Sequence, residues 1–204
     1  MKNTDLRYSA YLQILKEELV PAMGCTEPIA LAYGAAVARK TLGSLPDKVE
    51  VAASGSIIKN VKSVIVPHTG HLKGIPAAAA AGIVAGDAEK KLEVISYVKE
   101  EQIEEIKQFL EQTPITVEHL ESGITFDIEV TVHAGADSAK VRIANYHTNI
   151  VRIEKNGEIL ENIPVSGEEE NNLTDRSLLD MEHIWDFINT ADVEDVKPIL
   201  EPQL

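Results

Sequence analysis

The stretch GIPAAAAAGIVAG, residues 74–86, contains five consecutive alanines. From Pro76 to about Ala85 this composition predicts an α-helix, because alanine has the highest helix propensity of the natural residues. Its small side chains let a neighbouring backbone approach closely, so we expect the helix to lie in the interior. The apolar run is shorter than the roughly 18–20 residues that a membrane-spanning helix needs. It therefore predicts a core helix rather than a transmembrane segment.

Other helices are predicted on both sides of this stretch. Residues 5–20 place apolar side chains on one helical face, with Thr4 as a candidate N-cap and Pro21 after the last apolar position. A second helix is predicted from Thr26 to Gly43, so that Cys25 precedes its N-terminus. KVEVAAS, residues 48–54, alternates like a strand, and two charged helices are expected between residues 87 and 113.

The pattern then changes to a period of two. ITVEHL (115–120), FDIEVTVHAG (126–135) and SAKVRIANYHTNIVRIEKNGEIL (138–160) are rich in Val, Ile and Thr, and EKNGE predicts a type I′ hairpin. Helices followed by consecutive strands predict an α+β fold, with helices packed on a mainly antiparallel sheet. We expect one α+β domain over residues 1–165 and an acidic polar linker over 166–177. Residues 178–204 are expected to begin a helical C-terminal part that is incomplete here.

Charge and composition exclude several classes of function. The net charge is −14, and residues 166–204 contribute eleven Asp or Glu against two Arg or Lys. Nucleic acids and anionic membranes are therefore not expected as partners, since both need clustered Lys and Arg. The N-terminus does not resemble a signal peptide, which predicts a cytoplasmic protein. A single cysteine excludes an intrachain disulfide framework.

That cysteine lies in PAMGCTEPIAL, residues 21–31. Free cysteines are commonly small buried hydrophobes. A thiol at a helix N-terminus is also a candidate nucleophile or metal ligand, because the helix dipole favours the thiolate. Glu27 offsets part of that effect with its negative charge. Thr26 and Glu27 are included with Cys25 in the candidate site.

Three further stretches are candidates for binding or catalysis. SGSIIKNV, with Ser54, Gly55, Lys59 and Asn60, is either an ordinary strand-to-helix turn or an anion-binding turn. VPHTGHLKGIP, with His68, Thr69, Gly70, His71 and Lys73, suits a carboxylate or phosphate, and a histidine there suits a general base. Its two histidines are too few ligands for structural zinc. NYHTNIVRI places His147, Thr148 and Asn149 in a strand pattern, where they are either ordinary polar residues or contacts to a substrate.

In this order the four stretches resemble the iron–sulfur L-serine dehydratase alpha-chain and L-cysteine desulfidase family, including uncharacterised bacterial relatives. The matching strings are GCTEPIALAYGAA, SGSIIKNVKSVIVPHTGHLKGIPAAAAAGIVAGD and NYHTNIVRIEKNGEIL, which cover most of residues 20–160. The resemblance implies a lyase of amino-acid catabolism that holds a [4Fe–4S] cluster. Such an enzyme β-eliminates L-cysteine to pyruvate, ammonia and sulfide, or L-serine to pyruvate and ammonia.

Site roles follow from the resemblance by position. Cys25 would be a cluster ligand or lie close to the cluster, the segments 54–60 and 68–73 would hold the substrate carboxylate, and His68 or Lys73 would act in catalysis. One thiolate cannot hold a [4Fe–4S] cluster. We therefore expect this chain to be an inactive N-terminal part without a bound cluster. Its expected partner is the C-terminal half of the same protein or a partner subunit, and homodimerisation is left open.

Two alternatives remain at this point. One is a non-catalytic module that binds a small anion or amino acid without a cluster. The other is a pyridoxal-phosphate lyase that uses Lys59 or Lys73.

Overall fold

The computed structural model describes residues 1–19, 21–22, 24–165 and 173–201. The chain divides into two compact units. An α/β unit spans residues 22–167, and a terminal helical unit combines residues 1–21 with residues 168–204. The N-terminal helix thus belongs with the C-terminal helices, which differs from the single domain expected over residues 1–165. Most of the expected linker, residues 166–172, lies outside the described residues.

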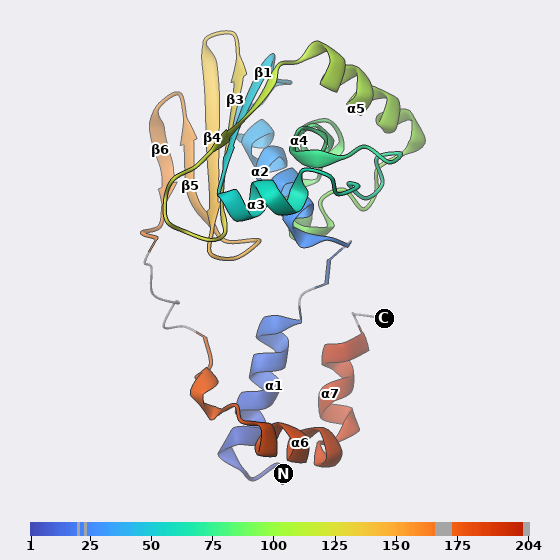
Figure 1. Cartoon of the computed structure of the whole chain (residues 1–204), viewed down its shortest axis with the longest axis vertical. Helices are drawn as coiled ribbons and strands as arrows, with labels where there is room; N and C mark the ends of the chain where they lie inside the picture. Colours follow the sequence, from blue (N-terminus) through green and yellow to red (C-terminus); the bar gives the residue numbers. More distant parts are fainter. Residues whose placement is uncertain (20, 23, 166–172, 202–204) are drawn as a thin grey trace. The chain divides into compact units, whose positions relative to one another are not determined.

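The α/β unit contains a six-stranded sheet in the order β2-β1-β3-β4-β5-β6 (Figure 1). Neighbouring strands are antiparallel except β1 and β2, which are parallel. The predicted α+β class with a mainly antiparallel sheet is confirmed. The strands are β1 (Lys48–Ala53), β2 (Ile115–His119), β3 (Asp127–Ala134), β4 (Asp137–Ala144), β5 (Ile150–Lys155) and β6 (Glu158–Asn162).

The hairpin between β5 and β6 has the predicted type I′ turn. Both central residues have positive φ, 53° at Asn156 and 80° at Gly157. A type I′ turn needs positive φ at both positions, and asparagine and glycine adopt it at low cost.

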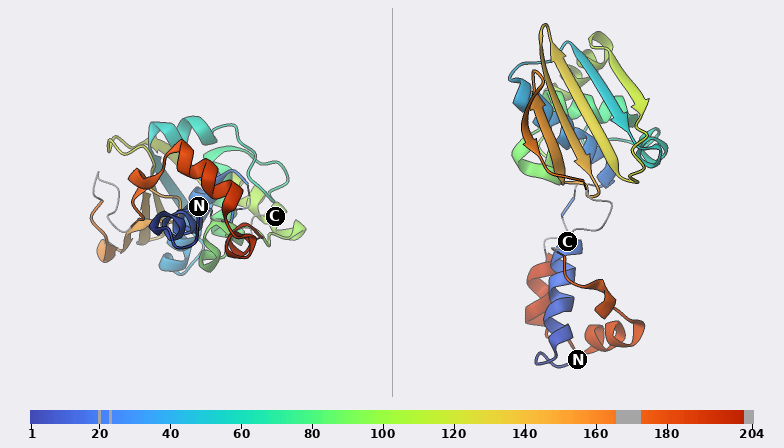
Figure 2. Two further views of the ribbon diagram at one scale, coloured as in Figure 1. Left: turned by 90° about the horizontal axis from the view of Figure 1, so that it is seen from below. Right: turned by 90° about the vertical axis from the view of Figure 1, so that its left-hand side faces the viewer.

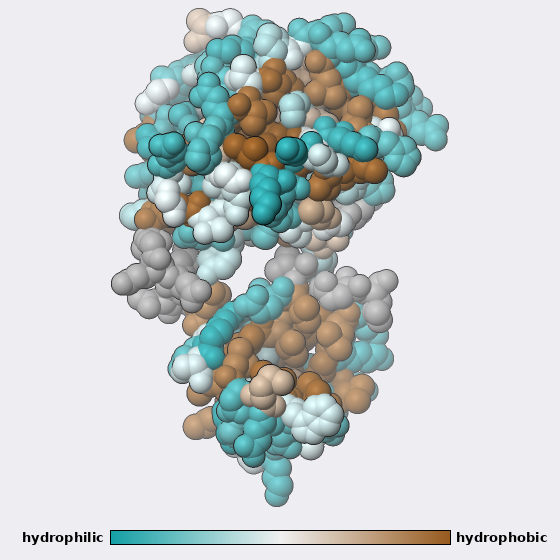
Figure 3. All heavy atoms as spheres, in the orientation of Figure 1, coloured by the Kyte–Doolittle hydropathy of each residue, from teal (hydrophilic) through white to brown (hydrophobic). Residues whose placement is uncertain are grey.

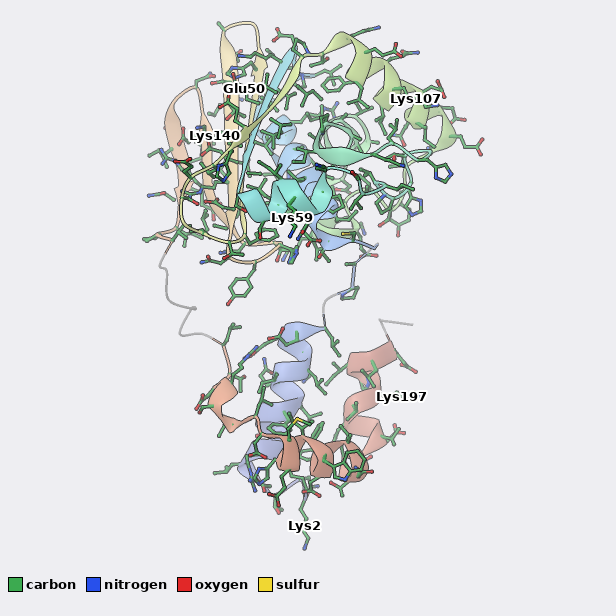
Figure 4. All side chains as sticks on the ribbon, in the orientation of Figure 1. Lys2, Glu50, Lys59, Lys107, Lys140 and Lys197 are labelled. Carbon is green, nitrogen blue, oxygen red and sulfur yellow. The ribbon has the colours of Figure 1, made fainter. Side chains whose placement is uncertain are left out.

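Register places alternate side chains of the central strands on one buried face. Val51 of β1 lies opposite Val130 of β3, which lies opposite Val141 of β4. All three are buried. The opposite face carries ion pairs such as Lys140 with Glu129, and Figure 4 labels Glu50 and Lys140 on this sheet. The strands therefore follow the pattern of a sheet with one packed face and one polar face.

Helices cover the apolar face of the sheet (Figure 2). α2 (Thr26–Leu42) packs on β3 and β4, and α4 (Gly74–Ala85) packs beside α2. α3 (Gly55–Val61), the 3-10 helix η1 (Ala88–Glu93) and α5 (Glu100–Gln112) complete the unit. The alanine helix is interior, as predicted: all five alanines from Ala77 to Ala81 are buried. Instead of the helix expected over residues 87–98, the chain forms the 3-10 helix η1, which is kinked at Lys91, where φ is 47°.

Contact between α2 and α4 is unusually close. A Cβ atom added to Gly82 of α4 would lie 2.0 Å from the carbonyl oxygen of Ala32 in α2. One turn later, a Cβ on Gly86 would lie 2.9 Å from the Cβ of Ala36. From the first contact to the second, the residue number rises by four in both helices, so the two helices run in the same direction. Their N-termini therefore lie at the same end of the pair.

The terminal helical unit consists of α1 (Leu6–Glu18), η2 (Arg176–Leu178), α6 (Met181–Thr190) and α7 (Val193–Leu200). Asp5, rather than the predicted Thr4, caps α1 by accepting a hydrogen bond from the Arg7 backbone N–H. The core of this unit is small. The ring of Phe187 lies 5.4 Å from each of the rings of Tyr8 and Tyr11. No helix among the described residues is long and apolar enough to cross a membrane.

Substituting Gly82 with alanine tests the helix contact. The new methyl group overlaps the Ala32 backbone, which cannot move without displacing α2. We expect Gly82→Ala to lower the free energy of unfolding by at least about 2 kcal/mol, although alanine has the higher helix propensity. Urea unfolding followed by far-UV circular dichroism measures this, because the only tryptophan lies in the other unit.

Gly34→Ala is the matched control in α2. Its added Cβ would meet side-chain atoms and no backbone, with Cδ1 of Ile143 at 3.3 Å and Cγ2 of Val130 at 3.6 Å. We expect a change within about 1 kcal/mol. Equal destabilisation by the two substitutions would contradict the role given to the Gly82–Ala32 contact.

Candidate functional site

Cys25 is the N-cap residue of α2 and is exposed. Its Sγ donates a hydrogen bond to the Glu27 carboxylate at 3.1 Å. Gly24, just before it, has a φ of 135°, and a Cβ there would lie 3.4 Å from Cγ of Pro67. The predicted position of Cys25 immediately before a helix is confirmed. As the N-cap residue, Cys25 makes no side-chain capping hydrogen bond.

The electrostatic surroundings of Cys25 do not favour the thiolate. Burial raises the pKa of its thiol, and the hydrogen bond to Glu27 and the negative charge of Glu27 raise it further. The Glu27 backbone N–H opposes this rise without reversing it. The helix N-terminus was expected to favour the thiolate, but burial and the neighbouring carboxylate outweigh it. Cys25 is thus a protonated thiol at neutral pH.

Glu27 joins α2 to α3. Its second carboxylate oxygen accepts a hydrogen bond from the side-chain amide of Asn60 at 3.4 Å. Burial alone would raise the pKa of Glu27, but hydrogen bonds from Cys25, its own backbone N–H and Asn60 together lower it. Glu27 is therefore an ionised carboxylate with two side-chain donors.

His147 lies near this carboxylate, in the loop between β4 and β5. Burial lowers the pKa of its imidazole, and the negative charge of Glu27 opposes that shift. The ring lies 4.4 Å from the ring of Phe126, with an interplanar angle of 57°. The fold thus brings parts of three predicted stretches together: Cys25 with Glu27, Asn60, and His147.

The stretch containing His68 and His71 forms a closed loop before α4. The Val66 backbone N–H donates to the Leu72 carbonyl at 2.9 Å. Both histidines are exposed and have positive φ, 57° and 71°. Such φ values are uncommon outside glycine. Pro67, at the beginning of this loop, lies against Gly24. The loop therefore starts close to Cys25 at the N-terminus of α2.

Side chains of this loop point in different directions. Thr69 is fully buried, and its hydroxyl donates to the Val66 carbonyl at 2.8 Å. Gly70 faces α5, because a Cβ there would lie 3.1 Å from Cγ2 of Ile103. Lys73 is exposed and is the N-cap residue of α4, without a side-chain cap. The loop therefore presents its histidines to solvent and uses Thr69 internally.

Several candidate side chains bind the backbone. The buried Ser54 hydroxyl donates to the Thr125 carbonyl at 2.6 Å, and the Asn149 amide donates to the Ala144 carbonyl at 2.9 Å. These contacts hold α3 to the β2–β3 connection and close the β4–β5 loop. Lys59 is exposed on α3 (Figure 4). Thr26 and Thr148 are half-exposed, and Gly55 is exposed.

His119 lies outside the four stretches that the sequence singled out. In the structure a Cβ on Gly55 would lie 3.4 Å from its Nε2, so the imidazole lies against the start of α3. This follows from the parallel pairing of Ala53 with His119 at the ends of β1 and β2. No local sequence signal predicts that pairing, because β2 follows β1 by about sixty residues.

A metal centre is not present in the part of the chain that the structure describes. No three or more His, Cys, Asp or Glu side chains there are grouped so that they could hold a metal ion. Cys25 is the only thiol of the chain. The donor set of these residues does not fit a [4Fe–4S] cluster, which needs several thiolates.

Sequence comparison finds close relatives along nearly the whole chain. A UPF0597 protein of Desulfitobacterium hafniense (strain Y51) is 52% identical over 204 residues, which are 100% of this chain and 47% of that protein. A UPF0597 protein of Lachnoclostridium phytofermentans is 45% identical over 197 residues, 97% of this chain and 47% of that protein. A UPF0597 protein of Treponema denticola is 42% identical over 199 residues, 97% of this chain and 46% of that protein.

The chain thus spans about half the length of the curated relatives that it matches. No family model matches the chain, and no solved structure matches it.

These relatives correct the resemblance stated from the motifs. They carry the name UPF0597 protein, which states no activity, and none carries the name of an L-serine dehydratase or an L-cysteine desulfidase. The assignment to that family was wrong. The motifs are local strings, whereas the comparison covers 93–100% of the chain in six such relatives.

Removing the charge of Glu27 tests the state of the Cys25 thiol. We expect Glu27→Gln to lower the thiol pKa, because it removes the negative charge and the carboxylate acceptor that raise it. The rate of alkylation by iodoacetamide, measured against pH by mass spectrometry, then rises at lower pH than in the native chain. The single cysteine makes the reaction site-specific.

Glu93→Gln, an exposed carboxylate on η1, is the control for this measurement. It should leave the pH dependence of alkylation unchanged. A Glu27→Gln profile that is unchanged, or that moves to higher pH, would show that Glu27 does not control the thiol.

Proposed function

We propose that the α/β unit binds a small L-amino acid at the N-terminus of α2 and forms one half of a longer protein. The observation that carries this proposal is the ionised Glu27 beside a helix N-terminus whose N-cap residue makes no side-chain capping hydrogen bond. An α-amino acid carries an ammonium group and a carboxylate on the same carbon atom. It matches an arrangement with one carboxylate and one set of anion-binding N–H groups.

The two charges of the ligand would have separate partners. Glu27 accepts the ammonium group, since its oxygens are already fixed by Cys25 and Asn60. The carboxylate lies at the α2 N-terminus, where the helix dipole and the first backbone N–H groups other than that of Glu27 favour an anion. The α4 N-terminus lies at the same end and is also uncapped, so its dipole has the same sign there.

Neighbouring groups limit the size and polarity of the side chain that such a ligand can have. Cys25 and the ring of His147 are uncharged at neutral pH, which suits a short and weakly polar side chain. Lys59 precedes Asn60 on α3 and is exposed, so it adds a positive charge on the helix that contacts Glu27. These features support a ligand of the size of serine or cysteine.

Enzymatic β-elimination is a second proposal, and it concerns only the longer protein. The exposed thiol of Cys25 beside the proposed ammonium site favours it. The products would be pyruvate and ammonia from L-serine, with sulfide in addition from L-cysteine. Because the residues of this chain do not fit a [4Fe–4S] cluster, we derive no reaction step through one.

The cytoplasmic location expected from the sequence also stays a prediction.

Titration with L-serine and L-glycerate tests amino-acid binding. The two ligands differ in an α-ammonium group against an α-hydroxyl group. We expect Glu27→Gln to weaken L-serine binding by about tenfold to a hundredfold, the loss of one charged hydrogen bond, with little effect on L-glycerate. Isothermal titration calorimetry measures both ligands on the chain and on a full-length relative, with Glu93→Gln as the control.

Failure of both the chain and the full-length relative to bind L-serine would refute the amino-acid site. An equal loss for L-serine and L-glycerate would refute the pairing of Glu27 with the ammonium group.

The lyase proposal is tested separately on the full-length relative. After anaerobic iron–sulfur reconstitution, we expect pyruvate from L-cysteine or L-serine, and a substitution of the cysteine that matches Cys25 should reduce iron content or activity. Absence of pyruvate refutes β-elimination without affecting the binding result. Unchanged iron content and activity in the cysteine variant refutes the role of Cys25.

A further inference from the structure

The terminal helical unit contains an apolar groove of about 790 Å³. It is lined by residues of α1, α6, α7 and the segments next to α6, and only Lys197 and Glu201 among the lining residues are charged. Figure 3 shows apolar residues gathered on the face of this unit that carries α1 and α7. Lining side chains from the three helices include Ile14, Leu15, Ile184, Ile188, Val196 and Leu200.

The groove exists because the helices of this unit bury only part of their apolar surface. The buried core of the unit consists of Tyr8, Tyr11, Ile14 and Phe187. On α6, Phe187 is buried in this core, whereas the next residue, Ile188, is 63% exposed. Leu200 and Val193 of α7 are also exposed. A helix with a second apolar stripe facing solvent indicates a surface that is covered by a partner.

Charge around the groove selects among partners. Residues 173–201 contain eight Asp or Glu, all exposed, and two Lys or Arg. A second copy of the chain would bring two acidic surfaces together, which costs free energy. An anionic membrane would repel the unit for the same reason. The surface therefore favours a partner with Lys or Arg beside its apolar residues.

The position of α7 points to the remainder of the longer protein. The relatives are about twice as long as this chain, and Leu200 and Glu201 at the end of α7 line the groove. Residues that follow α7 in such a protein begin next to the groove. A covalently joined segment has a high effective concentration there, about millimolar for a short linker.

We propose that an amphipathic α-helix from the C-terminal half of the longer protein fills this groove, with its apolar stripe against α1, α6 and α7 and with Lys or Arg along the edges. The partner helix would replace solvent around Ile188 and Leu200. The proposal is independent of the amino-acid site, because it concerns only residues of the terminal helical unit.

Hydrogen exchange compares the chain with a full-length relative. In the full-length protein the backbone N–H groups of α6 and α7 should exchange at least about tenfold more slowly than in the chain of 204 residues, because the docked helix suppresses local opening. In the full-length protein, a glutamate at the position of Ile188 should abolish this protection. Mass spectrometry of peptides covering residues 181–200 measures both.

Met181→Glu is the matched control, since Met181 is 82% exposed on the same helix and does not line the groove. It should keep the full protection. Equal exchange in the chain and the full-length protein overturns the proposal, and so does protection that survives the Ile188 substitution. A chain that dimerises in light scattering, and loses the dimer with Ile188→Glu, also overturns it by identifying a second copy as the occupant.

Discussion

The backbone contact between Gly82 and the carbonyl of Ala32 holds the α/β unit in its observed arrangement. Any side chain at Gly82 would overlap α2, so the distance between the two helices is set by main-chain atoms. Dense packing at such a distance gives many weak dispersion contacts that depend steeply on separation. The alanines of α4 serve this contact, and the small residues of α2 match them.

Close parallel packing has a consequence for the proposed site. Because α2 and α4 run in the same direction, their uncapped N-termini lie at one end of the unit. Each N-terminus carries a partial positive charge. Glu27 lies at this end and stays ionised, while burial, together with the hydrogen bond to Glu27 and its negative charge, raises the pKa of the Cys25 thiol. The helix dipole acts in the opposite direction, so burial and the position of one carboxylate together set the protonation state of Cys25.

The terminal helical unit is held together by a small aromatic core and by side-chain hydrogen bonds. Its core contains three aromatic rings and Ile14, and hydrogen bonds from the Tyr8 and Tyr11 hydroxyl groups tie α1 to the C-terminal segment. The Tyr8 hydroxyl donates to Asp195 at 2.8 Å and the Tyr11 hydroxyl to the Leu178 carbonyl at 2.9 Å. A unit of this size buries a small share of its surface. Its remaining apolar stripe is therefore available to a partner.

The sequence by itself determined the elements whose cause is local. Alanine composition predicted the interior helix, the period of two predicted the antiparallel strands, and Asn156 with Gly157 predicted the type I′ turn, because propensity and φ depend on neighbouring residues. Only the tertiary structure decided that α1 joins α6 and α7, that Glu27 meets Asn60, and that Thr69 and Ser54 turn their hydroxyl groups to the backbone. These depend on contacts between residues far apart in the chain, which periodicity does not encode. For the same reason the protonation state of Cys25 followed from its burial and from the placement of a carboxylate rather than from its position at a helix N-terminus.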